Sequence, residues 1–117
     1  MAYRKYRAKK VVVDDIKFDS KKEAGRYIQL KELEEKGAIS DLHRQVPFLL
    51  VPAQFGSTEK KKGKCLERAV RYVADFTYHD NVTNEDVVED VKGVKTPEYV
   101  IKRKLMLYFF NVRIREV

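Results

Sequence analysis

The chain has 117 residues, a formal net charge of +7 and a hydrophobic fraction of 44%. This length and composition predict one domain over residues 1–117 and exclude wholesale disorder. No apolar run is long enough to cross a bilayer, and none follows the basic N-terminus as in a signal peptide, so we expect no membrane partner. The lone Cys65 excludes a disulfide framework and a cysteine zinc site, and it indicates a reducing, cytoplasmic location.

The predicted elements alternate between strands and helices. In chain order we expect a hairpin over residues 10–18, a helix over 20–36, a buried strand flanked by prolines over 44–52, a mobile basic loop over 54–64, a long strand over 67–79, its partner over 86–93, a second helix over 96–110 and a closing strand over 111–117. Ser20 can cap the first helix, and Thr96 followed by Pro97 marks the start of the second. The second helix is apolar on most sides, so we expect it to pack closely against the sheet.

This order predicts an α+β domain whose core runs helix, three strands, helix, strand after an N-terminal hairpin. Its mixed sheet would carry a helix on each face.

The basic residues are unevenly placed along the chain. They gather in the N-terminal segment 1–10, in the loop 54–64 and on the second helix, whereas residues 80–95 are mostly acidic. A solvated surface is the simpler interpretation of any one group. Three basic groups around an acidic centre favour a polyanionic partner together with a bound cation.

Glu23 is the first candidate for chemistry. It completes a capping box with Ser20, in which its carboxylate would bind the first amide of the helix. It also lies near the middle of the helix face that should be buried, where a carboxylate needs a cation or hydrogen-bond donors. Both roles can hold together.

The strands supply the other candidates. Asp75 interrupts an apolar strand, and Asp90 and Lys92 project to one side of the next strand, with Glu89 on the opposite side. A structural ion pair explains Asp90 and Lys92 as well as an active site does. A one-residue bulge would exchange Glu89 and Asp90, and the sequence leaves this open.

The order Glu, Asp, Asp-x-Lys on these elements resembles the PD-(D/E)XK nuclease superfamily. More narrowly, four stretches resemble a small family of phage and prophage endonucleases, similar to Holliday-junction resolvases: FDSKKEAGRYIQL, QVPFLL, YVADFTY and VVEDVKG. The resemblance runs from about Lys10 to the C-terminus and implies a restriction-endonuclease-like core. The chain departs from the pattern in having Ala74 before Asp75 and an aspartate, not a glutamate, at position 90.

The resemblance implies a role for each matching residue. Asp75, Asp90 and the backbone carbonyl of Val91 would hold Mg²⁺ or Mn²⁺, and Glu23 would bind it directly or through a water. Lys92 would orient the attacking water or stabilise charge on the phosphate. The host cytoplasm would be the location of a phage-encoded member.

Further residues are candidates for nucleic-acid binding. Gln45 is a substrate contact that the resemblance implies, although strand-end polarity explains it equally well. The basic candidates are Lys60, Lys61, Lys62, Lys102 and Lys104.

The sequence therefore predicts a magnesium-dependent endodeoxyribonuclease that hydrolyses phosphodiester bonds in DNA, with selectivity for junctions or branches as one form. The first alternative is a basic binding protein that keeps the fold without cleavage. The second is a single-strand or RNA binder whose stacking platforms are Tyr3, Tyr6, Tyr72 and Tyr78. DNA versus RNA, one versus two metals and a homodimer versus a monomer are left open.

Overall fold

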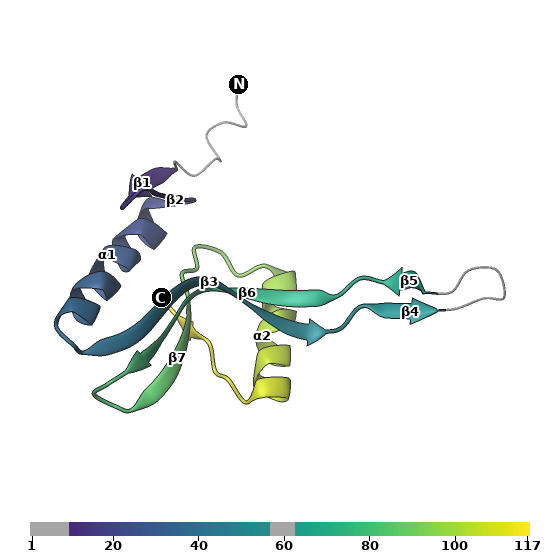
Figure 1. Cartoon of the computed structure of the whole chain (residues 1–117). Coiled ribbons are helices and arrows are strands. Elements are labelled where there is room, and N and C mark those ends of the chain that lie inside the picture. Colours follow the sequence, from purple (N-terminus) through teal and green to yellow (C-terminus); the bar gives the residue numbers. More distant parts are fainter. Residues whose placement is uncertain (1–9, 57–62) are drawn as a thin grey trace, which may run out of the picture.

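The computed structural model describes residues 10–56 and 63–117 (Figure 1). The basic N-terminal segment, apart from Lys10, lies outside these residues, as do Tyr3 and Tyr6. Lys60, Lys61 and Lys62 lie outside them as well.

The chain begins with the expected hairpin and helix. Strands β1 (Val11–Val13) and β2 (Ile16–Phe18) pair antiparallel, and Asp14 and Asp15 both have positive φ, of 51° and 62°. Two left-handed residues in succession make the type I′ turn that suits a two-residue hairpin. Helix α1 (Lys21–Glu35) starts where Ser20 Oγ accepts a hydrogen bond of 3.1 Å from the Glu23 amide.

The sheet has four strands in the order β3, β6, β7, β8. Their bounds are Ile39–Val51 for β3, Val70–Asp80 for β6, Glu85–Asp90 for β7 and Arg115–Glu116 for β8. The first three are antiparallel neighbours, whereas β8 runs parallel to β7, so the sheet is mixed and the expected α+β class is confirmed. The closing strand is shorter than predicted because only two of its residues pair.

Strand β3 differs from its prediction. It starts at Ile39 and continues through Pro47, which pairs with Val73, and its residues alternate between exposed and half-buried positions. Because β3 is an edge strand, the missing amide proton of Pro47 leaves no neighbour without a hydrogen bond.

The predicted loop 54–64 is wrong where the structure describes it. Strands β4 (Gln54–Gly56) and β5 (Lys64–Glu67) pair antiparallel as a separate two-stranded sheet, which we call the β4–β5 ribbon. The ribbon continues β3 and β6 away from the rest of the chain (Figure 1). The polar composition of this segment hid the strands.

Helix α2 (Pro97–Phe110) begins as predicted, with Thr96 Oγ1 accepting a 3.1 Å hydrogen bond from the Tyr99 amide. The expectation of close packing on most sides is wrong. Only Tyr99 and Met106 are buried, whereas the exposed fractions of Ile101 and Tyr108 are 58% and 81%. The helix has more apolar residues than positions that face the sheet. In residues 10–56 and 63–117, no helix is long and apolar enough to cross a membrane.

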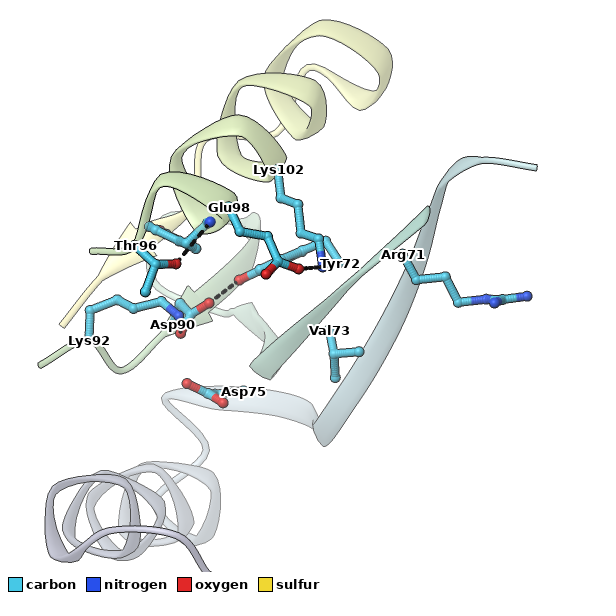
Figure 2. A pocket seen from close by; sticks show the side chains of 10 residues that line it. Arg71, Tyr72, Val73, Asp75, Asp90, Lys92, Thr96, Glu98 and Lys102 are labelled. Atoms are coloured by element: carbon cyan, nitrogen blue, oxygen red, sulfur yellow. Dashed lines mark hydrogen bonds and ion pairs between the residues drawn. The ribbon is translucent and has the colours of Figure 1, made fainter. Parts of the chain in front are cut away.

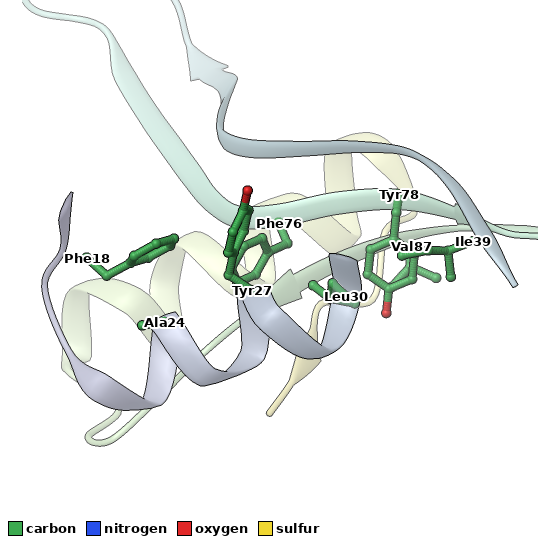
Figure 3. Packing of buried hydrophobic residues seen from close by; sticks show 8 residues of the cluster. All are labelled: Phe18, Ala24, Tyr27, Leu30, Ile39, Phe76, Tyr78 and Val87. Carbon is green, nitrogen blue, oxygen red and sulfur yellow. The ribbon is translucent and has the colours of Figure 1, made fainter. Parts of the chain in front are cut away.

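Two separate hydrophobic clusters pack the helices against the sheet. The α1 cluster contains Phe18, Ala24, Tyr27, Leu30, Ile39, Phe76, Tyr78 and Val87 (Figure 3). The α2 cluster contains Leu50, Tyr72, Ala74, Val88, Tyr99 and Met106. Val87 and Val88 are neighbours on β7 and belong to different clusters, so the two helices cover opposite faces of this strand.

Candidate active site

Strand β6 changes its packing partner at Asp75. Ala74 belongs to the α2 cluster and Phe76 to the α1 cluster, although alternation would place both on one face of a straight strand. The β3–β6 register places Gln45 opposite Asp75, and Gln45 has a φ of 51°. A left-handed residue within a strand is rare and bends the chain. Asp75 therefore lies where β6 passes from one helix to the other.

The Asp75 carboxylate has partners on both neighbouring strands. Its Oδ2 accepts a hydrogen bond of 2.8 Å from the Val91 amide, and its Oδ1 lies 3.4 Å from Nε2 of Gln45. Burial is the largest effect on this group, and the nearby Asp90 carboxyl adds to it, so together they raise the pKa of Asp75 to about 7. Two carboxyl groups held this close compete for one proton unless a cation joins them.

Asp90 is almost fully buried, with an exposed fraction of 2%. Its two oxygens have different partners: Tyr72 donates a hydrogen bond of 2.5 Å to Oδ2, and the Lys92 ammonium lies 3.2 Å from Oδ1. A buried carboxylate needs such partners to offset the loss of hydration. The orientation of Asp90 is therefore fixed by groups on both sides.

Lys92 is held in place by its side chain and by its backbone. The ammonium lies 4.1 Å from the centre of the Tyr99 ring, while the Lys92 carbonyl accepts a 2.9 Å hydrogen bond from Lys22 of α1. The Lys92 amide donates to the Val117 carbonyl at 3.2 Å. Strand β7 ends at Asp90, so Lys92 lies just beyond the strand on which the sequence placed it.

Glu23 approaches the same region from α1. The Ser20 half of the predicted capping box is present, but the Glu23 carboxylate lies 3.5 Å from Arg44 Nη2. Burial is the main cause of a raised Glu23 pKa, which Arg44 lowers and the nearby Asp19 and Asp90 raise further. Glu23 is near enough to Asp75 to contribute to the raised pKa of that group as well.

Asp75, Asp90 and Lys92 border one open hollow of about 280 Å³ between β6, the end of β7 and the first turns of α2 (Figure 2). The full lining consists of Arg71, Tyr72, Val73, Asp75, Asp90, Lys92, Thr96, Glu98, Tyr99 and Lys102. Glu23 is not part of this lining. In Figure 2 the two carboxylates and Lys92 lie at one end of the hollow, and Arg71 points away from them.

The structure separates the two lysines predicted on α2. Lys102 borders the hollow and pairs with Glu98 at 2.9 Å. Lys104 instead borders a second hollow of about 320 Å³, together with Arg103 and Arg113. The two lysines therefore cannot contact the same phosphate.

Glu89 lies on the α1 side of the sheet, as alternation predicts. It is fully buried and accepts two hydrogen bonds of 2.7 Å from Arg26 and one of 2.9 Å from Tyr78. The β6–β7 register is regular from Phe76 to Asp80, so no bulge exchanges Glu89 with Asp90. Glu89 ties α1 to β7.

Tyr72 and Arg44 are parts of this region that sequence reasoning missed. Tyr72 was considered only as a stacking platform, together with Tyr78. Both rings are buried, with exposed fractions of 3% and 5%, so neither face is open to a base. The contact between Tyr72 and Asp90 gives no sequence signal, because alternation from Asp75 places Tyr72 on the other face of β6.

The donor set fits a hard divalent cation. In the described residues, 10–56 and 63–117, no three His, Cys, Asp or Glu side chains gather closely enough to form a complete metal cluster. Mg²⁺ does not require one, since it keeps several waters and is held by one or two carboxylates together with substrate phosphates. Asp75 and Asp90 could supply those carboxylates, and their competition for a proton is what a cation would relieve.

The fold and the site together define a small α+β domain with a paired carboxylate and lysine site at the end of a mixed sheet. The chain belongs to the family described as "Protein of unknown function (DUF1064)", whose model matches residues 3–117. No curated protein and no solved structure matches the chain.

Proposed function

We propose that this protein is a metal-dependent nuclease that hydrolyses phosphodiester bonds in DNA. The observation that carries the proposal is the meeting of Asp75, Asp90 and Lys92 at one end of an open hollow. Two carboxylates for a cation and an ammonium for an anion are the groups that phosphate hydrolysis needs. Their order along the chain supports the resemblance to PD-(D/E)XK nucleases.

Asp75 and Asp90 would hold Mg²⁺ or Mn²⁺, with the Val91 carbonyl as a further ligand and Glu23 acting directly or through a water. When bound, the ion supplies an acidified water and neutralises charge on the phosphate. Tyr72 keeps the Asp90 carboxylate oriented.

The chain's own residues account for the remaining steps. The oxygen of a water forms a bond to phosphorus as the bond to the leaving ester oxygen breaks. The water's proton passes to solvent, to which the hollow is open, and the leaving oxygen takes a proton from solvent. Lys92 stabilises the negative charge that develops on the phosphate oxygens.

A DNA-binding protein without cleavage is the second candidate. It is favoured by the pairing of Lys92 with Asp90 and by the lack of a complete metal cluster in residues 10–56 and 63–117. In that case the carboxylates and Lys92 serve the fold, and the basic residues alone serve the partner.

One assay distinguishes the candidates. The purified protein is incubated with duplex, single-stranded and branched DNA in Mg²⁺, in Mn²⁺ and in EDTA. We expect cleavage of at least one substrate with either metal, none in EDTA and none by Asp75→Asn/Asp90→Asn. Binding without cleavage under all these conditions would support the second candidate.

A further inference from the structure

The β4–β5 ribbon stands apart from the rest of the fold. Its two strands contact mainly each other among the elements in residues 10–56 and 63–117, and Figure 1 shows the ribbon projecting past α2. An isolated two-stranded hairpin is only marginally stable in water. Phe55 and Leu66 on this ribbon have exposed fractions of 62% and 61%. A ribbon of this kind is best explained by a partner that lies against it.

The charge of the ribbon and its base favours an anionic partner. Lys64 lies on the ribbon, and Arg68 and Arg71 lie on the chain that connects it to the candidate active site. All three are exposed, and Glu67 is the only acid between Lys64 and Arg71. No ion pair joins these three cations to another described residue, so their charges remain for a partner.

The ribbon is continuous with the candidate active site. Arg71 borders the hollow that contains Asp75, and β6 carries both residues. At about 3.3 Å per extended residue, Lys64 lies up to roughly 36 Å along the chain from Asp75. One helical turn of B-form DNA is about 34–36 Å long.

We propose that the β4–β5 ribbon, with Arg68 and Arg71, lies in the major groove of a B-form DNA duplex beside the candidate active site. The inference rests on the proposed function for its choice of DNA. The major groove admits a two-stranded β-ribbon, and cations along both strands of the ribbon face phosphates on either side. Phe55 and Leu66 give the ribbon apolar surface to place against base methyl groups and sugars.

The same geometry excludes an RNA duplex as an equivalent partner. The A-form major groove is deep and narrow, and side chains cannot enter it. A single strand has no groove and would contact fewer of the ribbon's cations. The three exposed cations also make a second, equally basic copy of this chain a poor occupant.

The test measures how salt changes DNA affinity. A triple variant, Lys64→Gln/Arg68→Gln/Arg71→Gln, is compared with a control of equal charge, Lys17→Gln/Lys36→Gln/Arg113→Gln, whose residues are exposed and lie away from the ribbon. Dissociation constants for a labelled 24-base-pair DNA duplex, the matching RNA duplex and a single strand are measured by fluorescence anisotropy in EDTA, so that no cleavage occurs. Circular dichroism checks that each variant is folded.

For the DNA duplex, each lost phosphate contact should reduce the slope of log affinity against log salt by about 0.9. The loss of affinity between 50 and 200 mM salt should then shrink about 3.5-fold per contact in the triple variant. The control should keep the wild-type slope. RNA duplex and single strand should bind more weakly and respond less to the triple substitution.

Equal slopes in the triple variant and the control would overturn the inference, as would equal binding of the RNA duplex. A wild-type dimer that becomes monomeric in the triple variant, with DNA binding unchanged, would assign the ribbon to a second copy. Ribbon-dependent DNA binding without cleavage in Mg²⁺ or Mn²⁺ would support the inference while rejecting the proposed hydrolysis. A protein that binds no nucleic acid would overturn both.

Discussion

The phenol of Tyr72 donates a hydrogen bond of 2.5 Å to Oδ2 of Asp90. A similar bond of 2.9 Å joins Tyr78 to Glu89, the preceding residue of β7. Both tyrosines are buried on β6, but the two carboxylates face opposite sides of β7. The chain therefore contains two matched phenol–carboxylate pairs, of which only one belongs to the candidate active site.

Tyr72→Phe should weaken metal binding, whereas Tyr78→Phe should not. Each substitution removes a hydrogen bond to a buried carboxylate and should cost about 1–3 kcal/mol of unfolding free energy. Only Tyr72→Phe releases a carboxylate that would hold the metal, and the loss of such an outer contact typically weakens metal affinity 10-fold or more. Calorimetric titration with Mn²⁺ and thermal melts check this, and equal Mn²⁺ affinity in both variants would contradict it.

Asp75→Asn should stabilise the metal-free protein above neutral pH. Because the folded pKa of Asp75 is raised to about 7 from 3.8, its ionisation costs stability progressively between about pH 4 and pH 7. An amide avoids this cost, which we place on the order of 2 kcal/mol after screening by solvent at the open side of the site.

The melting temperature of Asp75→Asn should therefore exceed that of the wild type at pH 8 and approach it near pH 4. Mn²⁺ should raise the melting temperature of the wild type alone. A less stable Asp75→Asn protein at pH 8 would show that Asp75 is a structural acid and would remove this argument for a cation.

The sequence predicts the elements that depend on local rules. The turn at Asp14 and Asp15, the caps at Ser20 and Thr96 and the opposite faces of Glu89 and Asp90 all follow from neighbouring residues. These signals act over a few positions, so no tertiary contact is needed to recognise them.

The bend at Gln45 and Asp75 could not be predicted in the same way. It requires a left-handed φ at Gln45, a residue with no special preference for that region. Without the bend, Tyr72 would not meet Asp90, and alternation alone gives the wrong face. The contact between Arg44 and Glu23 likewise depends on how α1 lies against β3.

Glu116 should make stability fall in acid. It accepts a 2.6 Å hydrogen bond from Tyr99 and pairs with Lys95 and Arg103 at 3.0 and 3.1 Å. These partners, with Tyr99 the strongest, lower the pKa of Glu116 to about 2 from 4.5. A lowered folded pKa gives stability that is present above about pH 4.5 and lost as the pH falls toward 2.

Glu116→Gln should therefore lower the melting temperature at pH 7 and have little effect at pH 2. Glu98→Gln is the control, because Glu98 is exposed and pairs only with Lys102 one helical turn away. Exposed pairs of this kind contribute little. A Glu116→Gln deficit that is the same at both values of pH would rule out the ionised carboxylate as its source.

Lys92→Ala separates an enzyme from a binding protein. Lys92 would act mainly on the transition state, whereas DNA affinity is shared among many cations. Cleavage should therefore fall about a hundredfold or more, as the loss of one transition-state donor typically causes. DNA affinity should change only severalfold. The loss of the contacts with Asp90 and Tyr99 should also lower the melting temperature slightly.

Lys95→Ala is the matched control, since Lys95 is three residues away and pairs with Glu116 outside the hollow. It should keep the wild-type cleavage rate. Cleavage, affinity and melting temperature are measured on each protein in Mg²⁺. If the wild type cuts DNA and Lys92→Ala cuts equally fast, Lys92 is only the partner of a structural ion pair, and the assignment of the active site is wrong.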